Sequence, residues 1–552
     1  MDKLKLSDSM IQKSRIKLAE SDTLASDSVL NIENYAGPWD RAAVSHFLRR
    51  TTLGHTYSNV SELLDMDLES AVDLVLADGP MPSPPINYDE DDDPSVSIGE
   101  TWVDTMPPAG VNQNYRARSI RAWSVNVPLS EGLSVRERMV IFWHNHFVTS
   151  NINDRRLVYD YLDLIRGHAF GNFKQFVKDM TIDHSMLRYL NGRDNTKTAP
   201  NENYARELLE LFTIGKGPLV AAGDYTNYTE DDIISIARVL TGWRTYGFNS
   251  ATTPIAVGFD QNRHDTDSKQ LSYRFDNAVI ENEDAEEYKT LIDIIFQKDE
   301  VARFICRKFY RYFVSDQIDA SVEQNLIEPL AQLMVANNYE IKPTLKALFM
   351  SNEFMQESNR GVLIKNPLEF MASIVKSTKV DLMADNFQAN YNVGQSLYYR
   401  LRDMQMEMHR HDSVAGWPAY YQAPGLSRMW LSSVSMPHRM YLSDRFTSYS
   451  YNTGGNSFRI DVLALIAELS NPYDPNILIT DLAQLFYPVS ITDNQVEFLK
   501  SILIPGLPDF EWTEEYANHI ADPDDQNLMN SVDSKLRDLI SSMMSLSEFY
   551  LF

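Results

Sequence analysis

The stretch RERMVIFWHNHFVTS, Arg136–Ser150, places two histidines and an asparagine inside one of the most apolar runs of the chain. Its apolar residues recur at intervals of three and four, the spacing typical of a helix packed against a core. A buried imidazole needs a hydrogen-bonding partner. His144 and His146 are therefore either satisfied core residues or ligands and proton carriers held in a pocket.

The same periodicity continues on both sides of this stretch and predicts a mainly α protein. Glycine-rich turns are scarce, and no helix follows a G-x-G-x-x-G or Walker-type loop. We expect a large multi-helix globular core with long irregular loops. The segments that carry the pattern include YDYLDLIRGHAF (159–170), NFKQFVKDMTID (172–183), TEDDIISIARVLTGW (229–243), EEYKTLIDIIFQ (286–297), VARFICRKFYRYFV (301–314) and IKPTLKALFMS (341–351).

Composition changes along the chain divide it into three parts. Residues 1–33 are polar and predict a mobile N-terminal segment, and residues 34–390 predict the main helical domain. Residues 391–552 begin with an irregular aromatic segment and return to helices, which we expect to pack on the main domain. Within the main domain, the acidic, Pro-rich residues 80–100 predict an exposed, solvated loop.

The overall composition excludes several classes of protein. The chain has 552 residues, 43% of them hydrophobic, and a net charge of −27. This composition argues against disordered and fibrous proteins. It also argues against nucleic-acid binding and adsorption to anionic lipid, because both need clustered Lys and Arg. No apolar run is long enough for a transmembrane segment, and the first residues contain no apolar signal region.

The only cysteine, Cys306, excludes an internal disulfide and a Cys-based metal site. Its apolar helical surroundings indicate a buried, inert thiol.

Helix geometry limits what the His-x-His pair can do. Residues two apart on a regular helix point about 200° away from each other. His144 and His146 can bind one ion only if the helix loosens near Asn145; otherwise, the two rings face different pockets.

A second polar group lies in NENYARELLELFTIG, residues 201–215. Asn203, Glu207 and Glu210 share one face of the predicted helix, and such an edge can supply carboxylates to a metal. The same carboxylates can instead form ion pairs with Arg206 or Arg238.

A third group is the loop GFDQNRHDTDSKQL, residues 258–271, which contains His264, Asp265 and Lys269. It could supply a third metal ligand, a general base, or an anion-binding His–Lys pair. These side chains could equally be ordinary polar residues of a solvent-exposed loop. The segment HDSVAGWPAYYQAP (411–424) is suited to covering a cleft or, more simply, to anchoring an irregular segment on the core.

These pieces together resemble the bacterial family known as domain of unknown function 1800. The matching motifs are AAVSHFLRRTTLG (42–54), RERMVIFWHNHFVTS, NENYARELLELFTIG, DIISIARVLTGW (232–243), HDTDSKQL (264–271) and SVAGWPAYY (413–421). They extend over nearly all of the chain that we expect to be ordered. The family's polar positions correspond to His144, Asn145, His146, Asn203, Arg206, Glu207, Glu210, Arg238, Trp243, His264 and Lys269.

The resemblance implies a helical protein without an assigned reaction. Many members are exported, and their genes often neighbour those of family 1501, which resembles phosphatases and sulfatases; this implies a protein partner. This chain has Phe212 where the family motif often has a histidine, which removes one potential ligand. It also shows no evident export signal, so the compartment stays open.

Two hypotheses of different classes follow. The one we favour is an enzyme with a His/Glu pocket, hydrolytic or oxidative, in which His144, His264, Glu207, Arg206 and Lys269 act in catalysis. In its metal-dependent form, His144, His146, Glu207, Glu210 and His264 would bind Zn, Fe or Mn. The alternative is a non-catalytic binding or assembly protein that acts with a family-1501 partner, in which a buried network of these polar groups fixes the helix packing. The enzyme hypothesis requires that the polar residues converge on one solvent-reachable pocket.

Overall fold

A computed structural model describes residues 32–89, 93–109, 113–382 and 386–552, and these form a mainly α protein, as the sequence predicts. Nearly all of the predicted mobile segment, 1–33, lies outside the described residues. Across the described ranges, none of the helices combines the length and the hydrophobicity that crossing a membrane requires.

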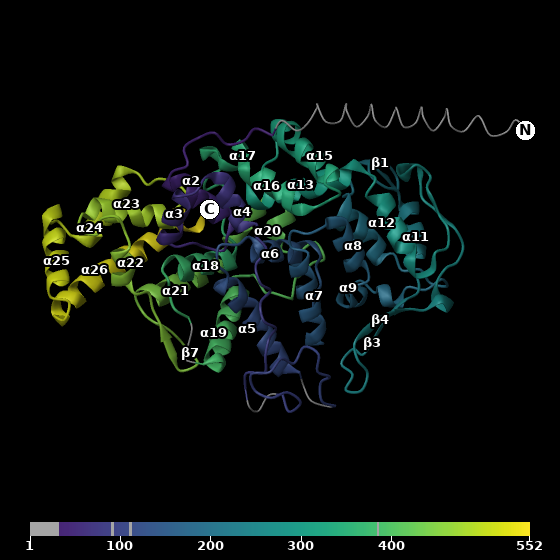
Figure 1. The fold of residues 1–552 in the computed structure, drawn as a ribbon, viewed down its shortest axis with the longest axis horizontal. Helices are drawn as coiled ribbons and strands as arrows, with labels where there is room; N and C mark the ends of the chain where they lie inside the picture. Colours follow the sequence, from purple (N-terminus) through teal and green to yellow (C-terminus); the bar gives the residue numbers. More distant parts are fainter. Residues whose placement is uncertain (1–31, 90–92, 110–112, 383–385) are drawn as a thin grey trace, which may run out of the picture.

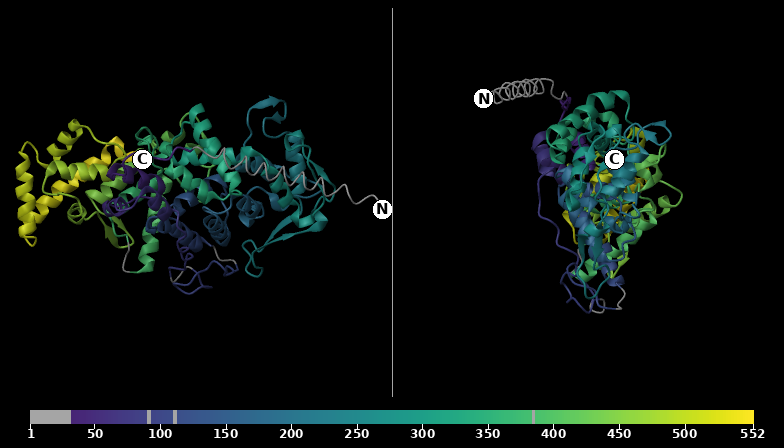
Figure 2. Two further views of the ribbon diagram at one scale, coloured as in Figure 1. Left: turned by 45° about the horizontal axis from the view of Figure 1, so that its top comes forward. Right: turned by 90° about the vertical axis from the view of Figure 1, so that its right-hand side faces the viewer.

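The helices form an elongated body with three regions along its long axis (Figures 1 and 2). The central region contains α2 (Arg41–Thr51), α3 (Tyr57–Leu64), α4 (Leu68–Val75), α5 (Asn114–Ser130), α6 (Arg136–His146), α7 (Arg155–Gly167), α13 (Asp299–Phe313), α14 (Ala320–Val322), α15 (Glu328–Ala336), α16 (Ile341–Met350), α17 (Asn352–Met355), α18 (Pro367–Ser377), α19 (Phe387–Asp403), α20 (Pro418–Tyr421) and α21 (Ser435–Thr447).

The two ends of the body contain the remaining helices (Figure 1). One end holds α8 (Phe173–Thr181), α9 (His184–Tyr189), α10 (Asn203–Glu207), α11 (Glu230–Val239) and α12 (Glu287–Ile295). The other end holds α22 (Val462–Ala467), α23 (Pro475–Phe486), α24 (Asp493–Leu503), α25 (Asp509–Ala521) and α26 (Gln526–Ser545).

Among the described residues, the strands form four small antiparallel pairs beside the helices. They pair β1 (Leu219–Ala221) with β2 (Asp224–Tyr225), β3 (Trp243–Tyr246) with β4 (Ala256–Phe259), β5 (Lys269–Gln270) with β6 (Val279–Ile280), and β7 (Tyr451–Thr453) with β8 (Asn456–Phe458).

Two clusters of buried apolar side chains make up the core. The first draws on residues between 43 and 355, and the second mainly on residues between 368 and 550. Helices α5 and α6 contribute to both clusters, Trp123 and Met139 to the first and Val125 and Ile141 to the second. These two helices therefore join the two clusters. The division into domains at residue 390 stays a prediction.

Helix α6 occupies the middle of the body because nearly every one of its side chains is buried. A helix that is buried all round must neutralise its charged residues internally. Glu137 does so by accepting two hydrogen bonds from Arg166 of α7. Arg138 pairs with Glu369 of α18 across 3.0 Å.

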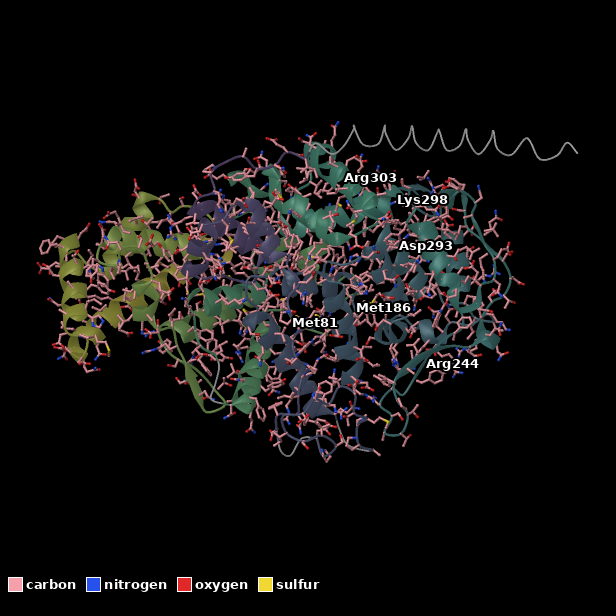
Figure 3. The ribbon with its side chains drawn as sticks, viewed as in Figure 1. Met81, Met186, Arg244, Asp293, Lys298 and Arg303 are labelled. Carbon is pink, nitrogen blue, oxygen red and sulfur yellow. The ribbon has the colours of Figure 1, made fainter. Side chains whose placement is uncertain are left out.

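Helix α13 is amphipathic and crosses close to the end of α6. Its buried side includes Cys306 and Phe309, and Phe309 contacts Phe142 of α6. Burial raises the pKa of the Cys306 thiol, consistent with the inert thiol that the sequence predicts. On its outer side, Arg303, which is labelled in Figure 3, pairs with Glu328 of α15.

The irregular aromatic segment was predicted to begin at residue 391, but residues 391–403 belong to α19, so this part of the prediction was wrong. Val393, Leu397 and Leu401 recur at helical spacing and bury one face of that helix.

The part between α19 and α20 is irregular and packs against the end of α6. The Ser150 hydroxyl donates to the carbonyl of His411, and the Trp417 amide donates to Asn145 Oδ1 across 2.8 Å. Gly416 has a φ of +93°, and a Cβ there would lie 2.3 Å from Asn145 Oδ1. Only glycine allows this close approach.

The acidic loop lacks helices in its described part, but it is less exposed than predicted. Tyr88 and Asp93 are buried, and Asp93 pairs with the buried Arg116 of α5 across 2.8 Å. The expectation of a fully solvated insertion was wrong for these residues, because the arginine gives one of the acidic side chains an internal partner.

Candidate functional site

A cavity of about 560 Å³ lies between the end of α6, the middle of α13 and the irregular segment that ends in α20. This volume is in the range of sites that hold small molecules. Aromatic and aliphatic side chains form most of its wall: Phe142, Tyr312, Ile318, Leu363, Tyr420 and Trp430. The polar and charged residues on the wall include Asn145, His146, Lys308, Arg311, Asp316 and Glu369.

The central feature of this wall is a hydrogen bond between Lys308 and His146. The Lys308 Nζ lies 2.9 Å from His146 Nδ1 and 3.0 Å from the carbonyl of Leu211. The other ring nitrogen, Nε2, lies 3.1 Å from the carbonyl of Phe212, to which it can only donate. Nδ1 therefore carries no proton and accepts from the lysine. The histidine is neutral, and its tautomer follows from these contacts.

The carbonyls that hold this pair come from an irregularity in the predicted carboxylate helix. Helix α10 continues as a π-helical turn, η2 (Leu208–Thr213), rather than as a regular α-helix. A π-turn shifts the backbone hydrogen bonds by one residue and is frequent at functional sites. Here the Leu211 and Phe212 carbonyls accept from Lys308 and His146.

Electrostatics make Lys308 an unusual lysine. Burial, together with the neighbouring charge of Arg311, lowers the pKa of Lys308 to about 7. Within the described part of the chain, no carboxylate forms an ion pair with it. Burial and the charge of Lys308 in turn hold the pKa of His146 well below its ordinary value. At neutral pH the lysine can therefore exist in both protonation states.

The two carboxylates on the wall are already engaged. Glu369 pairs with Arg138 and accepts from the backbone amide of Asn366 across 2.7 Å. Asp316 accepts from the hydroxyl of Ser427 across 2.7 Å. Arg311, in contrast, is exposed at the wall. The cavity therefore presents cationic groups, one of them with a pKa near neutrality, beside an aromatic surface.

His144 faces away from this cavity, toward the irregular segment. Its Nε2 accepts from the backbone amide of His409 across 3.2 Å, and its Nδ1 lies 3.1 Å from the Tyr161 hydroxyl. That hydroxyl donates to the Phe147 carbonyl, so it accepts from His144. The rings of His409 and His411 also pack against it. The two histidines of His-x-His thus face different surroundings, one of the two outcomes that helix geometry allows.

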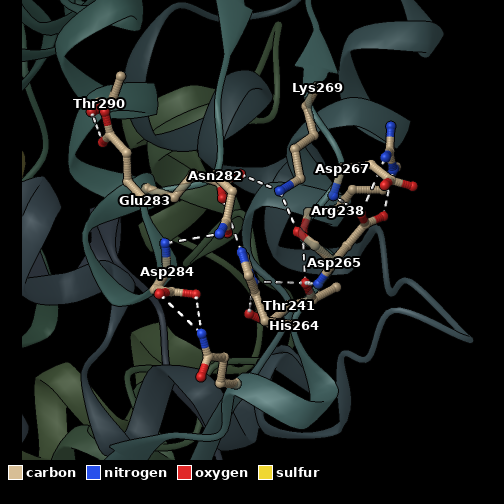
Figure 4. A network of polar contacts seen from close by, with 12 residues as sticks. Arg238, Thr241, His264, Asp265, Asp267, Lys269, Asn282, Glu283, Asp284 and Thr290 are labelled. Carbon is tan, nitrogen blue, oxygen red and sulfur yellow. Dashed lines mark hydrogen bonds and ion pairs between the residues drawn. The ribbon is translucent and has the colours of Figure 1, made fainter.

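The loop residues His264 and Lys269 form a separate buried network (Figure 4). Glu287 of α12 accepts from His264 Nε2 across 2.9 Å and forms an ion pair with Lys269 Nζ across 2.6 Å. All three side chains are fully buried. Burial acts to lower the pKa of His264, but its hydrogen bonds to Glu287 and Thr241 outweigh that effect and raise it. The network joins the loop to α12.

The remaining predicted residues occupy several different settings. Arg206 forms two hydrogen bonds with Glu230, and Arg238 forms two with Asp265. Glu210 accepts from the Tyr228 hydroxyl across 3.1 Å. Asn203 is exposed. Trp243 is buried and packs against Phe259 and Tyr288.

Glu207 is half-buried and does not belong to the cavity wall. Burial, then repulsion from Glu210, raises the pKa of Glu207 to about 7.

The structure does not bring the predicted metal ligands together. Of His144, His146, Glu207, Glu210 and His264, only His146 lines the cavity. In the part of the chain that the structure describes, no group of three or more His, Cys, Asp and Glu side chains is placed to hold a metal ion. Nor do the predicted catalytic residues His144, His264, Glu207, Arg206 and Lys269 line this cavity.

Sequence reasoning missed Lys308 and Arg311, the cationic groups of the cavity. Both lie in VARFICRKFYRYFV, which carries several basic residues at helical spacing. That pattern gives no sign of which of them turns inward. The available signal was a lysine followed directly by two aromatic residues, Phe309 and Tyr310.

The fold and cavity define a helical protein with a neutral histidine and a titratable lysine on an aromatic wall. The chain belongs to the family described as Protein of unknown function (DUF1800), whose model matches residues 46–549. The resemblance read from the motifs is thereby confirmed. No curated protein and no solved structure matches the chain.

Proposed function

We propose that the chain is an enzyme that uses Lys308 as a general acid–base group on a small molecule bound in the 560 Å³ cavity. The observation that supports this most is the hydrogen bond of 2.9 Å from Lys308 Nζ to the unprotonated nitrogen of His146. A group whose pKa lies near the working pH is the most effective acid–base catalyst.

The contacts of Lys308 favour this role. A neutral amine has two protons and one lone pair, and the two acceptors His146 Nδ1 and Leu211 O can use both protons. The lone pair then has a fixed direction of its own, away from both acceptors. When a substrate or a water molecule releases a proton, Lys308 can take it and later return it.

His146 acts as a positioning residue in this proposal. Its Nε2 proton is held by the Phe212 carbonyl, so its Nδ1 stays an acceptor. Because His146 Nδ1 is a neutral acceptor, it orients the amine of Lys308 but does not stabilise the protonated amine as strongly as a carboxylate would. An aspartate in the same place would raise the pKa of the lysine and remove it from the neutral range.

The wall favours a substrate with an apolar or aromatic body and an anionic or carbonyl group. Tyr312, Tyr420 and Trp430 supply flat apolar surface, and the cationic Arg311 can attract the polar group toward Lys308. Proton abstraction next to a carboxylate or carbonyl, or activation of water for hydrolysis, are reactions that such a site can catalyse.

The experiment measures the reactivity of Lys308 directly. The protein is treated with a limiting amount of an amine-reactive acylating reagent at a series of pH values, and each lysine is quantified by peptide mass spectrometry. We expect a labelling midpoint for Lys308 near pH 7, against about 10.4 for an ordinary lysine. Lys178, which pairs with Asp293 across 2.8 Å, is the internal control.

A Lys308 midpoint equal to that of Lys178 would remove the basis of the proposal. If the midpoint is low, Lys308→Gln should abolish turnover in a screen of small carboxylates and carbonyl compounds, while leaving the melting temperature close to that of the unmodified chain. Turnover that survives Lys308→Gln would assign the chemistry to another group.

A further inference from the structure

A second, much smaller cavity lies about the start of α18, and Glu369 lines both it and the first cavity. Its volume is about 20 Å³, enough for one water molecule or one monatomic ion and too little for a phosphate or a carboxylate. It is lined in part by Arg49, His55, Arg138, Lys365 and Glu369.

The charges around this small cavity do not balance. Among the described residues that line it, Arg49 and Arg138 supply guanidinium groups, Lys365 supplies an amine, and Glu369 supplies the only side-chain carboxylate. All four are buried. Burial lowers the pKa of Lys365 well below its ordinary value, and an anion beside it would favour its charged form. Concentrating like charges in a low-dielectric interior is costly unless an opposite charge accompanies them.

The neighbouring groups increase the imbalance. Arg50 and Arg439 are fully buried, and the charges of both act on Glu369. The charge of Asp316, another carboxylate, also acts on Arg50, but Asp316 accepts a hydrogen bond from the Ser427 hydroxyl.

Several polar atoms around this cavity have no protein partner. Both ring nitrogens of His55, and Nε and Nη2 of Arg138, are buried without a hydrogen bond to any described residue. His55 is 2% exposed and Arg138 is 1% exposed, so bulk water does not satisfy them. Buried donors of this kind are rare in proteins and call for an explanation.

We propose that this small cavity is a binding site for a monatomic anion, namely a halide such as chloride, that is part of the folded protein. One negative charge placed among Arg49, Arg138 and Lys365 would accept from the free donors of Arg138 and His55 and would reduce the repulsion among the cations. A water molecule could satisfy donors but would leave the charge unbalanced.

Chloride binding predicts a stability that depends on the identity of the anion. Melting temperature is measured in sodium chloride and in sodium gluconate at equal ionic strength, over a range of concentrations. An ion that binds only the folded state raises the melting temperature along a saturating curve. We expect a rise of a few degrees in chloride and bromide, and no such rise in gluconate, which is too large for the site.

Two variants and a control test the location. Lys365→Met removes one cation, and Ser377→Val fills the cavity without changing its charge, because Ser377 also lines it. Both should lose most of the difference between chloride and gluconate, whatever their own melting temperatures. Lys178→Met, at a distant ion pair with Asp293, should keep the full difference.

Crystals grown in bromide give the direct observation. An anomalous peak between His55 and Arg138 would support the site. Equal melting curves in chloride and gluconate, an unchanged anion effect in both Lys365→Met and Ser377→Val, or density that scatters only as water would each overturn the proposal. These outcomes are independent of the reactivity of Lys308.

Discussion

Lys308 of α13 donates to His146 of α6 across 2.9 Å, and burial together with the charge of Arg311 lowers the pKa of the lysine to about 7. His146 stays neutral, and the lysine changes its protonation state near neutral pH. This contact between two basic side chains on the wall of a cavity differs from the ion pairs that most buried lysines make. The amine of Lys308 is therefore the group to test for function.

The first prediction concerns the pKa of Lys308. In Arg311→Gln, loss of the neighbouring positive charge should raise the pKa of the lysine, and its labelling midpoint should move to higher pH by less than about 1 unit. Burial, the larger cause of the shift, remains. The matched control is Arg303→Gln on the outer side of the same helix, where the pair with Glu328 is lost instead. Equal shifts in the two variants would contradict the assignment.

The second prediction concerns stability in acid. Burial holds the pKa of His144 at about 3, and the pKa values of His146, His409 and His411 also lie well below the ordinary value. The unfolded chain binds these protons near pH 6.5, whereas the folded chain does not. Stability is therefore fully present above about pH 6.5 and is lost as the pH falls toward the folded-state values, by up to about 1.4 kcal/mol per pH unit for each histidine.

A single substitution tests the contribution of one of these histidines. Neither ring nitrogen of His411 has a hydrogen-bonding partner among the described residues, and its ring packs on His144 and Trp417. His411→Phe keeps an aromatic ring there and removes the titration. Urea unfolding between pH 7 and pH 5 should show a shallower loss of stability in the variant. A slope as steep as that of the original chain would mean that His411 is protonated in the folded state.

The third prediction concerns the buried network of His264, Lys269 and Glu287. Glu287→Gln removes the negative charge that His264 and Lys269 share, and loss of one partner of a buried ion pair costs about 3–5 kcal/mol. The exposed pair of Arg206 and Glu230 is the control, where Glu230→Gln should cost about 0–1 kcal/mol. Urea unfolding measures both. Similar small effects would show that the network does not stabilise the fold.

The fourth prediction concerns the contact between Gly416 and Asn145. Gly416→Ala combines a positive φ with a Cβ that would lie 2.3 Å from Asn145 Oδ1, so we expect a loss of about 1–3 kcal/mol or more. Gly455→Ala also has a positive φ, of 79°, but its Cβ would meet nothing within 4 Å. The difference between the two measures the cost of the close approach. If both variants lose the same free energy, the segment adjusts without strain.

The helical architecture and the buried position of the His-x-His stretch could be predicted from the sequence. Apolar residues at intervals of three and four report directly which face of a helix is buried. Local geometry also limited His144 and His146 to two outcomes, because side chains two apart on a regular helix diverge, and the structure decided between them. The aromatic segment was recognised as an anchor on the core, but its first residues, 391–403, proved to be helical.

The composition of the cavity could not be predicted in the same way. His264 and Lys269 appeared to be candidates for a shared pocket, but Glu287, a carboxylate that joins them from α12, neutralises both. Lys308 lies more than 160 residues from His146 in the chain, and nothing local to either motif indicates that they meet. Which basic residue of α13 turns inward depends on how α13 crosses α6.

The sequence by itself determined the family, the helical class and the burial of the His-Asn-His stretch, because each depends on residue types at short, regular spacing. Only the tertiary structure decided that His146 pairs with Lys308, that His144 faces His409 and His411, and that buried cations gather around a small second cavity. Those relationships depend on the packing of helices that are distant in sequence. The protonation state of a buried group is set by that packing, since desolvation and neighbouring charge act through space rather than along the chain.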